Sequence, residues 1–259
     1  MGVVVISGVS KGIGFVTAKL FAQKGHTVYG LSRRGTGYEG AEHISCDITD
    51  EEAVKAAFAK IAEKEGHIDI LINNAGYVTS GAIEFTDTKD AQRQFDVNFF
   101  GGFRCIKYAL PAMKSGGKII NISSAAAIFP IPFQAFYSAS KAAVNSLSFT
   151  LANELSPFGI QVCAVMPGDT KTDPIREKTG NGAEKYGELI RKSIEVMERD
   201  EQNGMEPEYV ASCILKIARK KRLKPLYVAG PQYKFLACLM KFLPASFAND
   251  VIRLMYCPK

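Results

Sequence analysis

The amino-acid sequence predicts a single α/β domain built on a doubly wound parallel sheet. Short apolar runs rich in β-branched residues alternate with segments of helical periodicity, and a glycine-rich turn joins the first run to the first helix. Runs that are apolar throughout are typical of parallel strands buried on both faces. The 259 residues contain no internal repeat and no linker, so one domain accounts for the whole chain.

The periodicity places the elements in chain order. Strands are predicted at residues 3–6, 27–31, 68–72, 118–122, 161–165 and 226–229, in a sheet of about seven strands. Helices are predicted at 13–24, 51–65, 92–113, 137–155 and 207–219, and a charged helical pattern covers 184–199. In such sheets ligands bind beyond the carboxyl ends of the strands, where each motif described below falls.

Composition excludes several classes of function. A net charge of +6, spread along the chain, gives little support to nucleic-acid binding. Six scattered cysteines and three histidines show no metal-ligand spacing, and dispersed cysteines are typical of a reducing, cytosolic setting. No signal-peptide pattern and no apolar run of about 18 residues is present. The sequence therefore predicts a cytoplasmic protein with no metal and no transmembrane segment.

The first strand runs directly into the segment Ser7-Gly8-Val9-Ser10-Lys11-Gly12-Ile13-Gly14, which opens a helix. Glycines allow a tight turn and let backbone amides approach a pyrophosphate at the helix N-terminus. Placed between a strand and a helix, this loop predicts a dinucleotide site.

Tyr137 and Lys141 lie four residues apart, so on a helix they share one face. A nearby ammonium favours the phenolate and would lower the tyrosine pKa from its usual ~10. Such a tyrosine can exchange a proton with an alcohol or a carbonyl. Alone, the spacing is also typical of a half-buried aromatic residue beside a lysine.

Three motifs together resemble those of the short-chain dehydrogenase/reductase family. They are the Gly-x-x-x-Gly-x-Gly loop, the run Asn73-Asn74-Ala75-Gly76, and the Tyr-x-x-x-Lys pair. The resemblance extends to about Gly230 and departs at Ser7, where the family usually has threonine. It implies a Rossmann fold and hydride transfer between a nicotinamide cofactor and a ketone or secondary alcohol.

The resemblance also implies the catalytic residues Asn98, Ser124, Tyr137 and Lys141. Ser124 lies thirteen residues before Tyr137 and would hold the substrate oxygen, with Ser123 as the rival assignment. Asn98 would hold a water that returns protons through Lys141.

The second predicted strand ends in Ser32-Arg33-Arg34, without the carboxylate that binds the ribose hydroxyls of NAD. Arginine grips a 2′-phosphate bidentately, and Lys11 adds a second positive position, so NADP(H) is the expected cofactor. The predicted cofactor contacts are Gly8, Ser10, Lys11, Gly12, Ile13, Gly14, Arg33, Arg34, Asp47, Ile48, Asn74, Ala75, Gly76, Tyr137, Lys141, Pro167, Gly168, Thr170 and Thr172. Asp169 and Thr170 depart from the family's usual apolar residues.

Two segments bear on the substrate. Residues 169–204 are expected to form a substrate lid, because they follow the Pro167-Gly168 segment that precedes the family's substrate loop. Residues 231–259 form an apolar C-terminal extension, which could roof the pocket, dock on a subunit surface or lie on a membrane. The apolar loop 125–133 is read either as pocket wall or as core.

The loop and the extension together resemble the hydroxysteroid and retinol dehydrogenase branches of the family. The expected function is NADP(H)-dependent interconversion of a ketone and a secondary alcohol on a bulky, hydroxysteroid-like substrate. Reduction of 3-oxoacyl thioesters or of retinal is an alternative, and an NADP(H)-binding sensor without turnover is an alternative of another class. The resemblance further implies a homodimer or homotetramer, paired through the helices that carry Asn98 and Tyr137.

Overall fold

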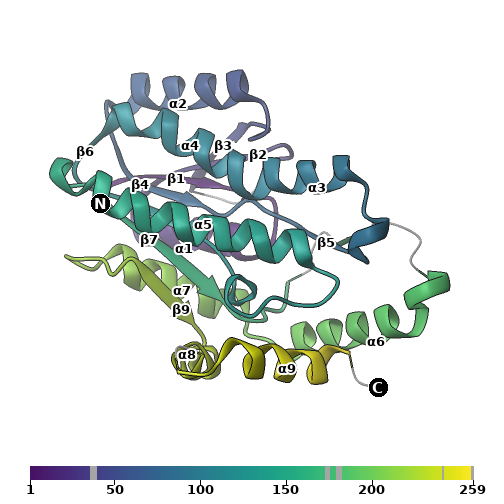
Figure 1. Cartoon of the computed structure of the whole chain (residues 1–259). Coiled ribbons are helices and arrows are strands. Elements are labelled where there is room, and N and C mark those ends of the chain that lie inside the picture. The colour runs from purple at the N-terminus through teal and green to yellow at the C-terminus, as the bar shows by residue number, and fades with distance from the viewer. Residues whose placement is uncertain (36–39, 173–175, 179–182, 241, 258–259) are drawn as a thin grey trace.

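The computed structural model describes residues 1–35, 40–172, 176–178, 183–240 and 242–257 (Figure 1). Its centre is a seven-stranded parallel sheet with helices on both faces, so the predicted doubly wound fold is confirmed. In spatial order the strands are β3 (Ala41–Ser45), β2 (Thr27–Ser32), β1 (Val3–Ser7), β4 (Ile68–Asn73), β6 (Met113–Ile122), β7 (Gln161–Pro167) and β9 (Leu226–Ala229). The order reverses between β1 and β4, where such a sheet opens a crevice for ligands.

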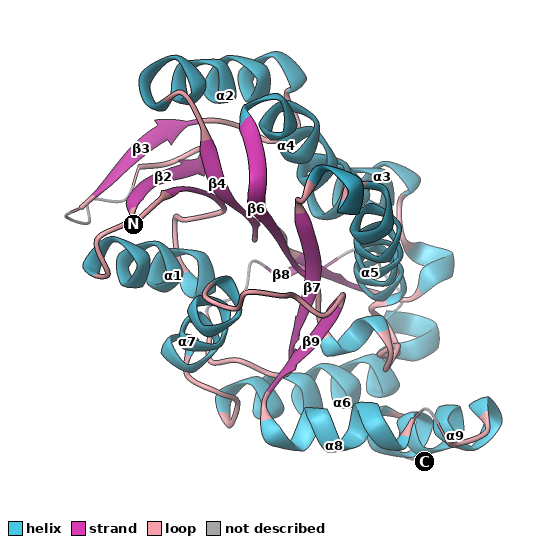
Figure 2. Ribbon diagram, turned by 90° about the vertical axis from the view of Figure 1, so that its left-hand side faces the viewer, coloured by secondary structure: helices cyan, strands magenta, loops and turns pink. Residues whose placement is uncertain are grey.

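Helices cover the sheet in two layers (Figure 2). One face carries α2 (Glu51–Glu65), α4 (Gly101–Ala109) and α5 (Ala135–Glu154). The other face carries α1 (Gly12–Gln23) and α7 (Pro207–Ala218). Helix α3 (Thr88–Phe95) precedes α4 along the chain.

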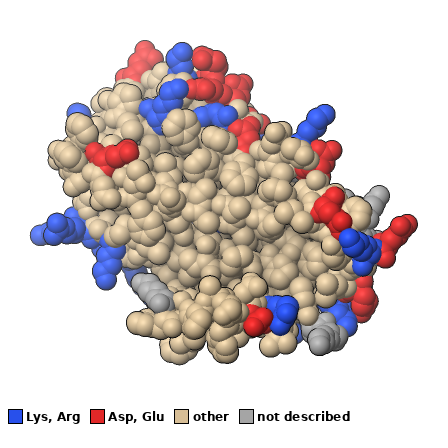
Figure 3. Space-filling model, viewed as in Figure 1, with Lys and Arg blue, Asp and Glu red and all other residues tan. Residues whose placement is uncertain are grey.

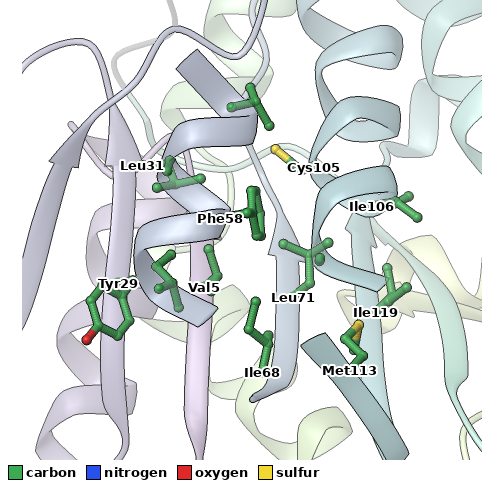
Figure 4. Close-up of a cluster of buried hydrophobic side chains, with 14 of the residues drawn as sticks. Val5, Tyr29, Leu31, Phe58, Ile68, Leu71, Cys105, Ile106, Met113 and Ile119 are labelled. Atoms are coloured by element: carbon green, nitrogen blue, oxygen red, sulfur yellow. The ribbon is translucent and has the colours of Figure 1, made fainter. Parts of the chain in front are cut away.

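Alternate residues of each central strand feed the two layers of the core. Val5 joins Phe58 and Leu71 in the cluster under α2 and α4, which Figure 4 shows. Val4 instead joins Phe21 and the α1–α7 side. This alternation is the period-two geometry of a strand, and it explains why the run has no polar face.

The structure corrects two predictions about elements. β3 went unpredicted because Ala41–Ser45 is an edge strand with mostly polar, half-exposed residues. The single helix expected at 92–113 is instead α3, a π-helical turn at Asp96–Phe100, α4 and a 3-10 turn, and Met113 begins β6. The residue directly after the π turn, Gly101, has to be a glycine because an added Cβ there would lie 2.4 Å from Ile48 Cδ1.

The C-terminal part lies at the β9 end of the sheet. Helix α6 (Ala183–Gln202) packs against α9 (Ala245–Tyr256), and α8 (Pro231–Leu239) follows β9 directly (Figures 1 and 2). A second sheet pairs β5 (Val78–Ser80) with β8 (Arg176–Lys178). Part of the expected lid, 173–175 and 179–182, lies outside the described residues. Within the described ranges, no helix has the length and apolarity needed to cross a membrane.

Candidate active site

The glycine loop after β1 is locked to the segment after β4. Ser7 Oγ accepts hydrogen bonds from the backbone amides of Asn74 (3.1 Å) and Ala75 (3.2 Å). Gly8 has φ +72°, and a Cβ on it would lie 2.6 Å from Ala75 Cα. A Cβ on Gly14 would lie 2.3 Å from Gly8 O. This backbone cradle at the N-terminus of α1 fits the pyrophosphate of a dinucleotide.

The segment after β7 lies against the same loop. Gly12, with φ +59°, faces Thr172, whose Cγ2 would be 3.3 Å from an added Cβ. Pro167 ends β7, and Gly168 lies against the ring of Tyr233, where a Cβ would come within 2.0 Å. The structure thus brings the predicted contacts 8–14, 74–76 and 167–172 together at one edge of the sheet, with Ser10, Lys11 and Ile13 at the start of α1.

Positive charge gathers where β2 ends. The amide of Gly8 donates to Leu31 O (2.8 Å), so the glycine loop and the end of β2 lie side by side. The side chains of Lys11, Arg33 and Arg34 are exposed, and none of them has an ion pair within the described part of the chain. The donor set matches the chemistry of a 2′-phosphate.

Asp47 and Ile48 follow β3 at this edge. Asp47 Oδ1 accepts from both the amide (3.0 Å) and the hydroxyl (2.8 Å) of Thr49. Asp50, not Asp47, caps α2, because its carboxylate accepts two backbone amides of the first turn. Ile48 packs on Gly101. Contact of Asp47 and Ile48 with the cofactor stays a prediction.

The reacting centre is formed where β6 and α5 meet. The hydroxyl of Ser124 lies close enough to that of Tyr137 to lower its pKa, and Ser124 Oγ accepts a hydrogen bond from the amide of Ala126 (3.1 Å). Ser123 is turned away, since its buried hydroxyl donates to the backbone carbonyl of Lys141 (2.9 Å). Alternation along the strand end therefore presents Ser124 to the tyrosine.

Lys141 is buried beneath the tyrosine, with its side chain 4% exposed. Its Nζ donates to Ile122 O (2.9 Å) and lies 5.8 Å from the centroid of the Tyr137 ring. A Cβ on Gly76 would lie 3.3 Å from Lys141 Nζ and 3.1 Å from Asn98 Oδ1. Lys141 and Asn98 therefore border the same glycine.

Asn98 lies on the π-helical turn between α3 and α4. Its Nδ2 donates to Tyr77 O (2.9 Å) and to Ser140 Oγ (3.2 Å), and its Oδ1 accepts from the amide of Tyr77 (2.9 Å). The side chain thus ties the segment after β4 to α5. A water held by Asn98 stays a prediction.

The pKa values at this centre follow from burial. Desolvation lowers the pKa of Lys141 to about 8. Desolvation also raises the pKa of Tyr137, the nearby hydroxyl of Ser124 lowers it, and the carboxylates of Glu201 and Asp169 raise it further. The expectation that Lys141 brings the tyrosine pKa below its usual value is therefore wrong for this arrangement, because the ammonium points to a backbone carbonyl.

Asp169 is a residue that sequence reasoning noted only as a departure from the family. Its half-buried carboxylate accepts a hydrogen bond from the hydroxyl of Tyr233 on α8, and its carbonyl accepts from the amide of Met205 (2.9 Å). Tyr256 on α9 is also near, since Asp169 contributes, after burial, to raising its pKa to about 12. The extension thus reaches the site through tyrosines, a role hidden within its apolar pattern.

Aromatic contacts join α6 to the loop after Ser124. The ring of Tyr186 lies 6.0 Å from that of Phe133 and 6.3 Å from that of Phe85, measured between centroids. Lys185 pairs with Glu84 (2.8 Å) beside them. Helix α6 therefore lies against the loop after Ser124, and its role as part of a substrate lid stays a prediction.

Comparisons with known proteins agree with this geometry. The family model described as short chain dehydrogenase matches residues 2–181. The chain is 37% identical to a 3-ketodihydrosphingosine reductase of Bacteroides thetaiotaomicron, over 98% of this chain and 97% of that protein. It is 33% identical to a probable short-chain type dehydrogenase/reductase, VdlC, of Helicobacter pylori, over 97% of this chain and 96% of that protein.

A solved structure shows the same architecture. The crystal structure of a short-chain dehydrogenase from Streptomyces avermitilis superposes with a TM-score of 0.83 at 29% identity, covering 96% of each chain.

Proposed function

The chain belongs to the short-chain dehydrogenase family, as an oxidoreductase of alcohols and ketones, and on this premise we propose that it is an NADP(H)-dependent reductase of a bulky lipophilic ketone. The observation that carries the proposal is the placement of Tyr137 close to Ser124 and to the buried Lys141, beside the glycine cradle.

Each residue has a defined task in the reduction. NADPH, when bound, supplies the hydride to the carbonyl carbon. Ser124 and Tyr137 hold the carbonyl oxygen, and Tyr137 donates a proton to it as negative charge develops there. The raised pKa of Tyr137 keeps the phenol protonated at neutral pH, which suits a proton donor in reduction. Lys141, with a pKa of about 8, can return the proton to the tyrosine, and oxidation reverses the path.

NADP(H) is favoured over NAD(H) by charge. Lys11, Arg33 and Arg34 lie where the ribose would bind, and the end of β2 offers no carboxylate to its hydroxyls.

The loop beyond Ser124 supports a lipophilic ketone as the substrate. Beyond Ser124, the buried Ala125 and Ala126 lead into an apolar loop that meets the aromatic ring of Tyr186 on α6. One relative, 37% identical, is a 3-ketodihydrosphingosine reductase. This similarity favours a long-chain ketone over a steroid as the substrate of the present chain. The alternative substrates are 3-oxoacyl thioesters and retinal. A sensor function without turnover would leave the reacting centre without a role.

The test is NADPH oxidation with 3-ketodihydrosphingosine, a steroid ketone, retinal and an acetoacetyl thioester, repeated with NADH. We expect the largest kcat/KM for the long-chain ketone with NADPH. A larger kcat/KM for the acetoacetyl thioester would show that the substrate is a 3-oxoacyl thioester and not a lipophilic ketone. Turnover of none of the four compounds would favour the sensor function.

Pairing of two copies through the face of α4 and α5 forms part of the proposal. Charged side chains lie mainly around the rim of this face, and its middle is uncharged (Figure 3). Phe100, Phe103 and Phe149 are 47%, 44% and 41% exposed there. Analytical ultracentrifugation of the wild type and of Phe103→Glu would test this pairing. We expect a dimer or tetramer for the wild type and a smaller species for the variant, and a monomeric wild type would contradict the proposal.

A further inference from the structure

A carboxylate with no positive partner in the described part of the chain lies just beyond the carboxyl end of β7, which runs beside the end of β6 that Ser124 follows. Asp169 is two residues beyond Pro167, at the carboxyl end of β7, and is half-buried. Its carboxylate accepts from Tyr233, and no lysine, arginine or histidine pairs with it within the described ranges of the chain. Burial raises its pKa, because a charged carboxylate loses solvation there.

The backbone holds Asp169 rigidly in this place. Its carbonyl accepts from the amide of Met205, and Thr170 next to it forms a parallel bridge with the same residue. A Cβ on Gly204 would lie 2.6 Å from Asp169 O, so the end of α6 closes tightly over the loop. The backbone of Asp169 is therefore held between β7 and the turn that follows α6.

This position is unfavourable for reduction of a neutral ketone. In the transition state negative charge develops on the carbonyl oxygen held by Tyr137, and a nearby carboxylate repels it. The Asp169 and Glu201 carboxylates already disfavour the tyrosinate. The nearby Asp200 is paired with Arg199 (3.2 Å), which leaves that arginine engaged. A substrate that brings its own positive charge would turn the repulsion into attraction.

We propose that Asp169 is a specificity-determining residue that binds a positively charged amine on the carbon next to the substrate carbonyl. The inference rests on the proposed reduction of a lipophilic ketone and narrows it to long-chain amino ketones. The amine stays protonated throughout: hydride forms the new C–H bond, the C=O π electrons move to oxygen, and the proton of Tyr137 completes the alcohol. The hydroxyl of Tyr233 donates one hydrogen bond to this carboxylate.

The test compares two ketones that differ only at that position. One is 3-ketodihydrosphingosine, and the other is the same chain with hydrogen in place of the amino group. Wild type is expected to show a kcat/KM at least tenfold higher for the amino ketone. This comparison needs no variant, so equal values for the two ketones in an active enzyme overturn the inference while the proposed function stands.

Asp169→Asn removes the charge and keeps an acceptor for Tyr233. Its kcat/KM is expected to fall at least tenfold for the amino ketone and to rise a few-fold for the neutral ketone, since the repulsion is relieved. A purely structural role would lower both values together, which would overturn the inference. Tyr233→Phe is the matched control, because it removes the hydrogen bond, keeps the charge and should keep the preference for the amino ketone.

A binding measurement separates this inference from the proposed function. Titration calorimetry with NADP⁺ present compares dihydrosphingosine with the corresponding long-chain alcohol that lacks the amine. We expect tighter binding of the amine by wild type and no such difference for Asp169→Asn. If neither ketone is turned over, the proposed reduction fails, and the calorimetry still decides whether Asp169 binds an amine. Equal binding of both alcohols by wild type would overturn the inference.

Discussion

Backbone meets backbone around the glycine loop, whereas side chains from distant segments meet around Asp169. In the first region, Gly8 and Gly14 leave no room for a Cβ, and the atoms that an added Cβ would meet lie in the glycine loop itself or in Asn74 and Ala75. In the second, Asp169 follows β7 and Tyr233 lies on α8, 64 residues away. The first arrangement suits a dinucleotide cofactor, which many enzymes use, and we propose that the second binds the substrate. Where backbone atoms leave no room for a Cβ, a glycine cannot be substituted without strain. Where side chains make the contacts, substitutions can change the binding properties one residue at a time.

The largest effect is expected where the two regions meet. Tyr137→Phe removes the proton donor and leaves the ring, so kcat should fall by about 10²- to 10⁴-fold while NADPH still binds. Steady-state kinetics with NADPH fluorescence titration measure both quantities. Turnover close to that of wild type would show that another group supplies the proton.

The glycine cradle can be broken with a matched control. Gly8 and Gly66 both have φ +72°, but an added Cβ on Gly66 has no heavy atom within 4 Å. Gly66→Ala should lower the free energy of unfolding by about 1–2 kcal/mol through backbone strain alone. Gly8→Ala should lower it by about 1–3 kcal/mol more and abolish NADPH binding, because the Cβ meets Ala75. Equal losses in urea unfolding would contradict this account of the cradle.

The buried Lys141 predicts a pH dependence of stability. Its pKa is about 8 in the folded protein and near its ordinary ~10.5 when unfolded, so the unfolded chain binds more protons between these values. The free energy of unfolding of the apo protein should therefore rise from pH 7 to pH 10, by about 1–3 kcal/mol relative to Lys141→Met. Parallel curves for the two proteins would show that the lysine is neutral or solvated.

Cofactor choice is expected to shift by a smaller amount. Arg33→Ala should weaken NADPH binding by about 10- to 100-fold and leave NADH nearly unchanged, since only the 2′-phosphate loses a partner. Arg222→Ala, which changes an exposed arginine near the amino end of β7, is the control. Equal weakening of both cofactors would point to a general electrostatic effect.

The smallest effect is expected on the outer side of the extension. Phe242 is 80% exposed, so Phe242→Ser should change the free energy of unfolding by no more than about 0.5 kcal/mol. Ile214→Ala, at a fully buried site under the sheet, should cost about 2–5 kcal/mol. A large loss for Phe242→Ser in urea unfolding would mean that the extension holds the fold together.

The sequence determined six strands of the sheet, the glycine cradle and the shared helix of Tyr137 and Lys141, because each depends on local order. An apolar β-branched run, a glycine that needs positive φ, and a tyrosine one helical turn from a lysine are visible within a few residues. β3 was not predicted because an edge strand buries too little apolar surface to show a hydrophobic pattern in the sequence. The end of α3 was not predicted because helical periodicity continues on both sides of the π turn.

Only the tertiary structure decided what surrounds Tyr137. Burial, not the adjacent lysine, sets the direction of its pKa shift, and desolvation depends on all the chain that covers a group. The approach of Tyr233 to Asp169 likewise joins residues with no shared spacing. Local patterns thus specified the chemistry that is performed, while long-range packing placed the charge that selects the substrate we propose.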